Sequence, residues 1–444
     1  MSKDTPAGTR PPGQPPGWHN RAPDWYRDGR DHVWHPYTQM QDASPPLPVV
    51  STEGVHMTLA DGRRLIDGIG SWWTACHGYN HPHIVAAMEK QLAAMPHVMF
   101  GGLAHEPGYR LASRLAGLLP GDLNHVFFAD SGSVSVEIAL KMALQYWRNK
   151  GREGRRRILS FSNGYHGDTW GAMAVTDPGQ GMHGPFAELF GEPLIVDMPT
   201  APGSLQSFDR LLASEASSLA AIIVEPLVQG AGGMKFHRPE ILRAIAGTAR
   251  RHEVLLIADE IFTGFGRTGH MFACEGAEIV PDIMCLGKGL TGGVISLAAT
   301  VARDHIYEAF LSDDPARALM HGPTYMANPL ACAAAAASLD LFGDGARLDQ
   351  ARSIESGLRA GLEPCRGLDH VTDVRAMGAI GVVELACLDH LDWLRDALVD
   401  QGVWLRPFGN IVYLTPALTI GAEDLATLTG AVCRVMAEWD RRGR

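Results

Sequence analysis

Short apolar runs alternate with longer stretches of helical character through the middle of the chain, from about residue 76 to residue 341. The runs lack the polar alternation of a strand with one wet face, so we predict strands that are covered on both faces. Strands that alternate with helices are typical of an α/β fold with a mostly parallel sheet. The clearest strands are His125–Ala129, Ile158–Ser162, Ala221–Val224 and Val254–Ala258, and the clearest helix is Val134–Arg148.

The C-terminal part of the chain has a different pattern. It combines helices with predicted strands such as Ala379–Glu384 and Asn410–Leu414. We predict that residues 343–444 form a smaller α+β domain together with residues 31–75. Residues 76–342 are then expected to form the large domain, whose sheet is covered by helices.

The segment before the predicted domains has an unusual composition. Residues 1–24 hold six prolines and three glycines and almost no aliphatic side chains. Such a segment cannot bury enough apolar surface to offset its ordering entropy. We therefore expect residues 1–30 to be a flexible, proline-rich tail.

Charge, hydropathy and cysteine spacing exclude several kinds of partner. The formal net charge is −11 and the basic residues form no blocks, whereas nucleic-acid binding needs concentrated positive charge. No apolar run approaches the ~18 residues of a membrane helix, and no signal-peptide core precedes the predicted domains. We expect a cytoplasmic protein without nucleic-acid or membrane partners. The seven dispersed cysteines form no Cys-x-x-Cys pair, which indicates reduced thiols and no metal site.

The junction between the strand His125–Ala129 and the following helix carries the run Asp130-Ser131-Gly132-Ser133. The free backbone N–H groups and the dipole of a helix N-terminus favour a phosphate there. An ordinary N-cap explains the same composition, because Asp and Ser are favoured at such positions. The run alone leaves both interpretations open.

Two acidic residues, Asp259 and Glu260, follow the strand Val254–Ala258. Ligands of open α/β sheets bind beyond the carboxyl ends of the strands, so a carboxylate here faces the expected crevice. Beside a pyridine nitrogen it would keep that nitrogen protonated and the ring an electron sink. A loop-start acid that caps a helix or binds Mg²⁺ is the alternative, and the sequence does not decide which of the two points inward.

Lys288 lies between two glycines in the run Leu286-Gly287-Lys288-Gly289. A solvated turn is the common reason for such a lysine. The functional alternative is a Schiff-base lysine, whose amine must be partly desolvated to be nucleophilic near neutral pH.

Aromatic residues form the last group of candidates. Tyr165 follows the strand Ile158–Ser162, where its ring can stack on a flat cofactor or pack in the core. Tyr37 and the pair Trp72-Trp73 lie near the start of the predicted domains. One tryptophan of the pair is expected to be a packing residue, and the other can line a pocket for a large organic group.

Taken together and in order, these segments resemble the class III aminotransferases of pyridoxal-phosphate (PLP) fold type I. The similarity runs from about Asp31 to the C-terminus. It rests on the ordered motifs DSGS, GYHG, VEP, ADEIFTGFGRTG, LGKGLTGG and HGPTYMANPLACAAA.

The resemblance implies a role for each matching residue. It implies PLP as the cofactor and a homodimer in which Pro323 and Thr324 reach the phosphate from the other subunit. The implied catalytic residues are Lys288, which holds PLP, Asp259, which pairs with the pyridine nitrogen, Tyr37 and Asp168. The implied cofactor-binding residues are Gly132, Ser133, Tyr165, Asp259, Lys288, Pro323 and Thr324. The implied substrate-binding residues are Trp72, Trp73, Tyr165, Lys288, Gly322 and Arg406, the last as the partner of a carboxylate.

Further pieces are similar to the branch of this family that acts in biotin synthesis. They are HPYT from His35, SWW from Ser71, HGYNHP from His77, GDT from Gly167, VQGAGGM from Val228 and RPFG from Arg406. This branch implies S-adenosylmethionine as the amino donor and 8-amino-7-oxononanoate as the acceptor. Three alternatives remain: a class III enzyme with a lysine, diamine or ω-amino acid donor, a different PLP reaction, or an inactive binding protein. The presence of Lys288 and Asp259 disfavours the last.

Overall fold

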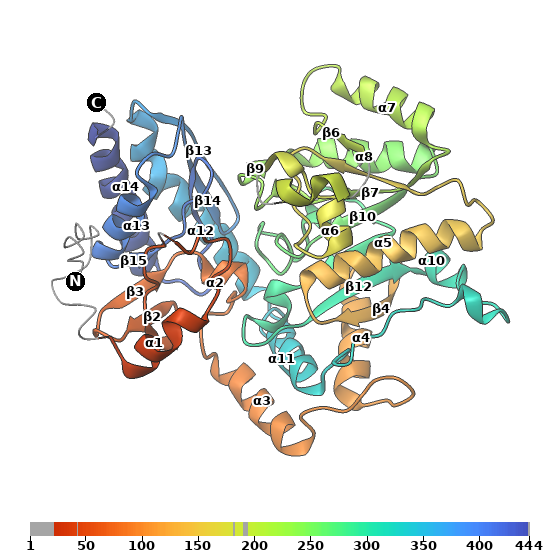
Figure 1. The fold of residues 1–444 in the computed structure, drawn as a ribbon, viewed down its shortest axis with the longest axis horizontal. Coiled ribbons are helices and arrows are strands. Elements are labelled where there is room, and N and C mark those ends of the chain that lie inside the picture. Colours follow the sequence, from red (N-terminus) through yellow and green to blue (C-terminus); the bar gives the residue numbers. More distant parts are fainter. Residues whose placement is uncertain (1–21, 42, 181–182, 190–193, 443–444) are drawn as a thin grey trace, which may run out of the picture.

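The computed structural model describes residues 22–41, 43–180, 183–189 and 194–442. Its helices and strands form two parts that lie side by side (Figure 1). One part is built from the middle of the chain. The other combines the N-terminal strands with the C-terminal region, so that segments far apart in the sequence share one half of the molecule.

A seven-stranded sheet forms the centre of the first part. Every strand in it runs parallel to the others except β12, which is antiparallel to both of its neighbours. The mostly parallel sheet predicted from the sequence is therefore confirmed. In spatial order the strands are β4 (Leu123–Ala129), β12 (Ala298–Arg303), β11 (Ile283–Leu286), β10 (Leu255–Asp259), β7 (Leu219–Val224), β5 (Arg157–Phe161) and β6 (Leu194–Val196).

Both faces of this sheet are buried, which explains why its strands show no polar alternation. Successive side chains of a strand point to opposite faces. Ile222 and Leu256 accordingly enter one hydrophobic cluster, whereas Ile223 and Ile257 enter another. The predicted strands are confirmed, and their carboxyl ends agree with the structure to within one residue.

Helices cover the two faces. The predicted helix Val134–Arg148 lies within α5 (Gly132–Asn149), which packs on β11 and β12. No helix in the described ranges is long and apolar enough to cross a membrane. The other helices of this part are α3 (Pro82–Ala94), α4 (Glu106–Leu118), α6 (Trp170–Ala174), α7 (Ser204–Glu215), α8 (Pro239–Arg251), α9 (Ala273–Gly276), α10 (Asp304–Glu308) and α11 (Pro329–Asp340), with 3₁₀ turns η3 (Pro178–Gln180), η4 (Gly184–Leu189), η5 (Lys288–Thr291) and η6 (Pro315–Arg317).

The second part contains two small sheets. In the first, β15 (Val403–Trp404) pairs in parallel with β3 (Arg64–Asp67), which joins the two ends of the chain. This pairing supports a smaller unit built from both chain ends, although its proposed limits at residues 75 and 343 stay a prediction. The remaining elements are β1 (Val49–Glu53), β2 (His56–Leu59), α2 (Gly70–Trp73), α12 (Ala346–Leu362), η7 (Glu363–Gly367), β13 (Val371–Met377), β14 (Ile380–Leu385), α13 (Leu391–Asp400), β16 (Ile411–Leu414) and α14 (Ala422–Arg442), with a hairpin of β8 (Val228–Gln229) and β9 (Lys235–Phe236) in the first part.

In residues 22–30 the structure differs from the predicted flexible tail. A short helix, α1 (Asp24–Gly29), is followed by the 3₁₀ turn η2 (Arg30–His32). Ala22 and Tyr26 are buried, and the Tyr26 hydroxyl donates to the Pro46 carbonyl at 2.9 Å. This contact joins residues twenty positions apart, so local composition did not reveal it. Residues 1–21 of the predicted tail lie outside the described residues.

Candidate active site

The predicted site residues of the first part gather at the carboxyl ends of its parallel strands. Asp259 ends β10, and Lys288 follows β11, its neighbour in the sheet. Glu225 follows β7, and Tyr165 lies beyond β5. This is the edge at which α/β sheets bind their ligands.

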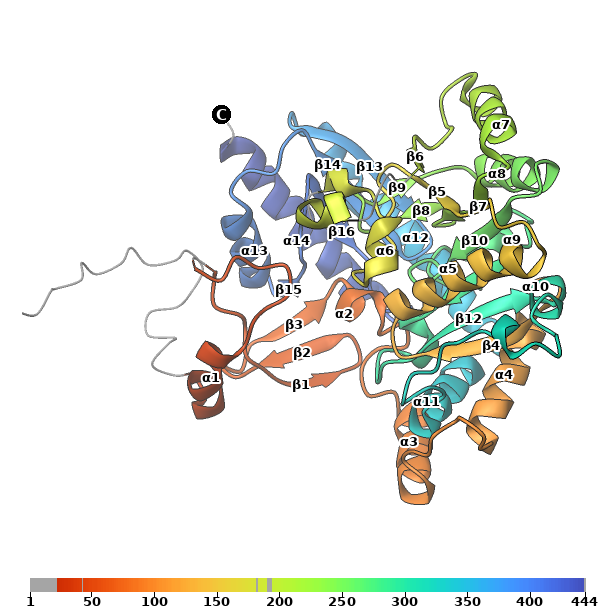
Figure 2. The same ribbon diagram turned by 45° about the vertical axis from the view of Figure 1, so that its right-hand side comes forward.

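Close packing holds the segment that carries Lys288. The Gly289 carbonyl accepts hydrogen bonds from the Cys76 thiol at 3.5 Å and from the Ser338 hydroxyl at 3.3 Å. Ser338 belongs to the alanine-rich helix α11, which lies beside α3 and α4 in both ribbon views (Figures 1 and 2). Lys288 itself has a left-handed backbone conformation, with φ 44°. Such a conformation is uncommon for a residue with a side chain and marks a position that the surrounding structure dictates.

The Lys288 side chain is partly buried. Its Nζ lies 4.9 Å from the centre of the Trp73 ring, and no hydrogen bond or ion pair of this atom occurs among the described residues. Burial lowers the pKa of the Lys288 ammonium, while the negative charges of Asp259 and Glu225 oppose that shift. A lowered pKa raises the share of neutral amine, which is the nucleophilic form.

The structure shows that Asp259 and Glu260 point in different directions. Asp259 is directed to the site, where its Oδ2 accepts a hydrogen bond from Nδ1 of His166 at 2.8 Å. Glu260 is directed away and accepts from the backbone N–H groups of Ala273 and Cys274 at the start of α9, at 3.0 and 2.7 Å. Glu260 is therefore a structural carboxylate, and Asp259 is the one that can face a ligand.

Two buried residues of the site, His166 and Glu225, belong to the family motifs, but the sequence predicted no role for them. His166 is the partner of Asp259. The Glu225 carboxylate accepts from the backbone N–H groups of Tyr165 at 3.1 Å and Gly230 at 2.9 Å, and burial raises its pKa to about 7. Their positions were the available signal, because Glu225 directly follows β7 and His166 lies in the loop after β5, where polar residues face the crevice.

The N-terminus of α5 carries Gly132 and Ser133. The first N–H groups of a helix have no partner within the helix, and here they point toward the same edge of the sheet. The Ser133 hydroxyl accepts from the backbone N–H of Asp168 at 3.1 Å. Gly167 makes this approach possible, because it has φ 127° and an added Cβ would collide with the Ser133 side chain. The interpretation of this run as an anion site remains compatible with its N-cap, since Ser131 accepts from the N–H of Val134.

A hydrogen-bonded cluster connects Tyr37 with two predicted residues that are distant from it in the sequence, Tyr165 and Asp168. The Tyr37 hydroxyl donates to Asp168 Oδ2 at 2.6 Å, and the Tyr165 hydroxyl donates to Asp168 Oδ1 at 2.9 Å. Burial and the bond to Asp168 raise the pKa of Tyr37 to about 12, so its phenol keeps its proton. His183, which sequence reasoning missed, lies with Nε2 3.1 Å from Asp168 Oδ1 and stacks beside Tyr165.

The two tryptophans have different environments. Trp73 is 8% exposed and packs on Phe262, with ring centres 4.4 Å apart, whereas Trp72 is 37% exposed. Trp72 lies edge-on to Tyr37 at 6.1 Å, and the Arg406 guanidinium is 5.0 Å from its ring centre. Arg406 has no carboxylate partner among the described residues. Tyr37, Trp72 and Arg406 thus form a wall with one positive charge that is available to an anion.

Three predicted residues are not brought to this group. Gly322, Pro323 and Thr324 lie between η6 and α11, and Gly322 and Thr324 are exposed. In the described part of the chain they make no hydrogen bond or ring contact with the Lys288 group. Within one chain the described residues therefore give these three positions no part in the site.

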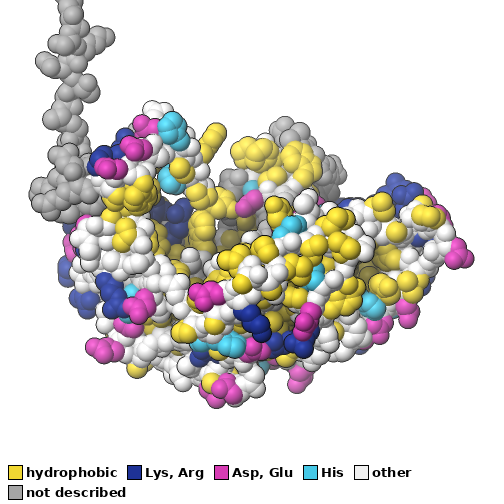
Figure 3. Space-filling model, turned by 90° about the horizontal axis from the view of Figure 1, so that it is seen from below, with side chains coloured by type: hydrophobic (Ala, Val, Ile, Leu, Met, Phe, Trp, Pro, Cys, Tyr) yellow, Lys and Arg dark blue, Asp and Glu magenta, His cyan; other side chains and the backbone are white. Residues whose placement is uncertain are grey.

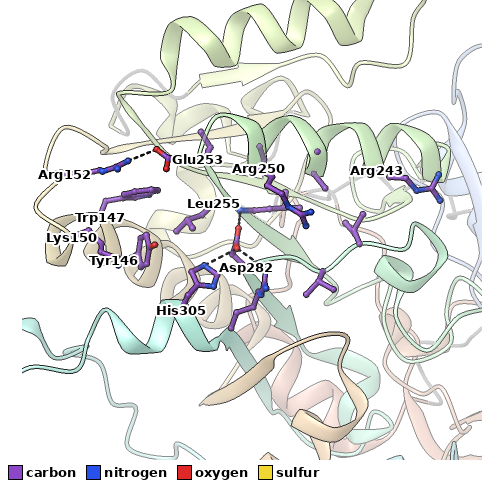
Figure 4. A pocket seen from close by; sticks show the side chains of 18 of the residues that line it. Tyr146, Trp147, Lys150, Arg152, Arg243, Arg250, Glu253, Leu255, Asp282 and His305 are labelled. Atoms are coloured by element: carbon purple, nitrogen blue, oxygen red, sulfur yellow. Dashed lines mark hydrogen bonds and ion pairs between the residues drawn. The ribbon is translucent and has the colours of Figure 1, made fainter.

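A separate cavity of about 680 Å³ lies at the opposite end of the sheet (Figure 4). Its wall includes Leu255 at the start of β10 and Asp282, which precedes β11. Lys288 and Asp259 stand at the other ends of these two strands. Asp282 is already paired with the side chain of His305 at 3.3 Å. We assign this cavity no part in the chemistry.

The site matches the chemical demands of PLP in three respects. Lys288 offers a partly buried amine without an acidic partner among the described residues. Asp259 offers a carboxylate that is 4% exposed and oriented by His166. The start of α5 offers backbone N–H groups without a partner inside the helix, and Gly132 leaves room there, because an added Cβ would lie 3.0 Å from the Ile261 side chain and would push it aside. An aldehyde, a pyridine nitrogen and a phosphate require these three kinds of group.

Comparison with known proteins gives the same answer. The family model "Aminotransferase class-III" matches residues 37–436. The chain therefore belongs to the class III aminotransferases, and it is a PLP-dependent enzyme of fold type I.

Individual relatives and solved structures are similar to this chain over nearly its whole length. An adenosylmethionine-8-amino-7-oxononanoate aminotransferase of Mycobacterium leprae is 47% identical over 414 residues, which cover 91% of this chain and 94% of the relative. The crystal structure of the protein of that name from Methanocaldococcus jannaschii is 32% identical, with TM-score 0.87, over 93% of this chain and 98% of the other. An amine transaminase from an uncultivated Pseudomonas species, solved in its PLP-bound form, is 32% identical with TM-score 0.83, over 91% and 98% of the two chains.

Proposed function

We propose that this enzyme transfers the amino group of S-adenosylmethionine to 8-amino-7-oxononanoate, which gives 7,8-diaminononanoate for biotin synthesis. The observation that carries the proposal is the wall of Tyr37, Trp72 and Arg406 beside a partly buried lysine. The name of the Mycobacterium leprae relative supports it. An aromatic wall with one cation suits two dissimilar substrates that share a carboxylate.

The residues of the chain would divide the work as follows. Bound PLP supplies the carbonyl that takes up the amino group and a ring that accepts electron density. Lys288 holds the cofactor and moves a proton at its Nζ, for which a lowered pKa is suited. Asp259, oriented by His166, places negative charge at the pyridine nitrogen. Gly132 and Ser133 hold the phosphate at the N-terminus of α5.

The other residues orient the substrates. Tyr165 would stack beside the bound cofactor, and its hydroxyl is fixed by Asp168. Asp168 also fixes the Tyr37 hydroxyl, so the position of one carboxylate determines that of both phenols. Arg406 binds a substrate carboxylate, because its planar fork matches two oxygens. Trp73, which is buried, excludes water from this side of the pocket, and the exposed ring of Trp72 is available to the substrates.

We further propose a homodimer in which Gly322, Pro323 and Thr324 of one subunit complete the site of the other. Exposed hydrophobic residues flank this segment, and the ring of Tyr325 lies 4.6 Å from His97. Figure 3 shows hydrophobic side chains spread over the side of the molecule on which α3 and α4 lie. Contiguous exposed apolar surface of this kind marks subunit interfaces. The exposed residues around the segment are Met99, Leu103, Tyr109, Met320 and Tyr325.

A cytoplasmic location is part of the same proposal. All seven cysteines are free thiols in the structure. Reduced thiols are the normal state of cysteines in the cytoplasm.

A half-reaction experiment tests the proposed donor. Holoenzyme is mixed with one candidate donor at a time, and the absorption of bound PLP is followed as it becomes pyridoxamine phosphate. S-adenosylmethionine should convert the cofactor completely, whereas lysine and simple diamines should leave it unchanged. Rapid conversion by a diamine with none by S-adenosylmethionine would contradict the proposed substrate and leave the assignment to the family intact.

A further inference from the structure

Two cysteines of the second part of the molecule lie next to each other without being bonded. Cys365 is in η7 and Cys433 is on α14, and their sulfur atoms are 3.4 Å apart. A disulfide holds its sulfurs at about 2.05 Å. A small movement of the two side chains would therefore bring the sulfurs within bonding distance.

The other five cysteines lack these properties. All seven are among the described residues, and Cys365 and Cys433 are the only two cysteines whose sulfurs are in hydrogen-bonding contact with each other. Cys387 is exposed, but its hydrogen bond to Asp389 raises the pKa of its thiol. Burial raises the pKa of the thiols of Cys76, Cys274, Cys285 and Cys332.

The two members of the pair are not equivalent. Cys365 is fully buried, whereas Cys433 is partly exposed. The Cys365 thiol donates a hydrogen bond to the Cys433 sulfur, and this bond lowers the pKa of Cys433. The charge of Arg434 acts in the same direction, while burial opposes it. A thiol with a lowered pKa, access to solvent and a second thiol behind it has the features of a redox-sensitive cysteine.

We propose that Cys433 and Cys365 form a redox-modification site, at which a peroxide oxidises Cys433 and Cys365 then closes a disulfide. Cys433 first loses its proton, and the thiolate attacks one oxygen of hydrogen peroxide. The O–O bond breaks, and the released hydroxide combines with the proton that Cys433 lost to give water. The Cys433 sulfenic acid is then attacked by the Cys365 sulfur, and the S–O bond breaks. A second water leaves with the Cys365 proton, so the two thiols lose two electrons and one peroxide gains them.

The bond would tie α14 to the turn that precedes β13. It joins residues that are 68 positions apart in the chain. A cross-link over a loop of this length restricts the unfolded chain and stabilises the folded one. The modification should therefore be visible in thermal unfolding without any effect on the residues of the active site.

Thiol counting after peroxide treatment tests the proposal. Reduced holoenzyme is freed of reductant, titrated with hydrogen peroxide, denatured and alkylated. Wild type should lose two of its seven thiols together, peptide mapping should find Cys365 joined to Cys433, and the melting temperature should rise by several degrees. Dithiothreitol should reverse all three changes. Cys387→Ser, which removes an exposed thiol outside the pair, should behave like wild type.

The single variants separate the two roles. Cys365→Ser should stop at a sulfenic acid on Cys433, which dimedone traps, and Cys433→Ser should form no cross-link. Loss of two thiols in Cys433→Ser, or a first reaction at Cys387 in wild type, would overturn the proposal. Phenylarsine oxide gives a second measurement on wild type that needs no variant. It should bind one arsenic per chain across this pair, and binding elsewhere or none at all would refute the site.

Discussion

The cofactor side and the substrate side of the active site are built from different kinds of structure. On the cofactor side, Asp259 and Glu225 are buried at the ends of adjacent parallel strands. On the substrate side, Tyr37, Trp72 and Arg406 come from three separate segments and remain partly or largely exposed. Tyr37 and Trp72 also have left-handed backbone conformations, with φ 50° and 55°.

This difference indicates how the two sides can change. Strand pairing fixes the register of Asp259 opposite Cys285, three residues before Lys288. A shift there would disturb the whole sheet, so the type of reaction is set by the framework of the fold. The substrate side is held by ring contacts and one hydrogen-bonded cluster, which a few substitutions could rearrange. Changes on the cofactor side should therefore remove catalysis, and changes on the substrate side should alter the choice of substrate.

Replacement of Lys288 should have the largest effect. Lys288→Ala removes the one amine that the described residues place at the site, so turnover should fall by at least about 10⁴-fold, which is the upper range for a lost acid–base group. Steady-state rates and single-turnover absorption measure this loss.

Lys150→Ala is the matched control, because Lys150 is an exposed lysine at the far end of the sheet. It should keep full activity. Borohydride reduction of wild type followed by peptide mapping should label Lys288, and a label on another lysine would disprove the assignment of this side of the site.

The neighbouring acids provide the second test. Asp259→Asn removes the negative charge at the pyridine nitrogen and should lower turnover about 100- to 1000-fold, the size seen for a lost electrostatic contact at a reacting group. Glu260→Gln should instead leave the cofactor spectrum unchanged and lower the free energy of unfolding by about 1–3 kcal/mol, because it disrupts the bonds to the start of α9. Rates, spectra and denaturant unfolding separate the two effects. An activity loss in Glu260→Gln as large as in Asp259→Asn would contradict the difference in orientation.

Much of the cofactor side could be predicted from the sequence because it depends on local rules. Strand runs and their carboxyl ends follow from hydrophobic pattern, and those ends place Asp259 and Lys288 at one edge. Local pattern did not decide between Asp259 and Glu260, and only the family resemblance favoured Asp259. Adjacent residues at a strand end point in opposite directions, and only the contact of Glu260 with α9 shows which is which.

The substrate side depends on contacts that no local pattern contains. Tyr37 meets Asp168 across 131 residues, and its contact with Trp72 relies on backbone conformations that the residue types do not favour. His183 likewise reaches Asp168 from a segment without a motif. Family resemblance supplied the names of several of these residues, but their geometry required the folded chain.

Replacement of Arg406 should have the smallest effect of the three and test the substrate side alone. Arg406→Ala removes a charged partner of a substrate carboxylate, which costs about 1.5–3 kcal/mol and corresponds to a roughly ten- to 150-fold lower kcat/KM. Arg406→Lys should give an intermediate loss, because it keeps the charge without the fork. The methyl ester of 8-amino-7-oxononanoate is the control substrate, since it lacks the carboxylate and should react at similar rates with wild type and Arg406→Ala. An equal loss of kcat/KM with the acid and the ester would show that Arg406 only supports the wall through Trp72 and does not bind the substrate carboxylate.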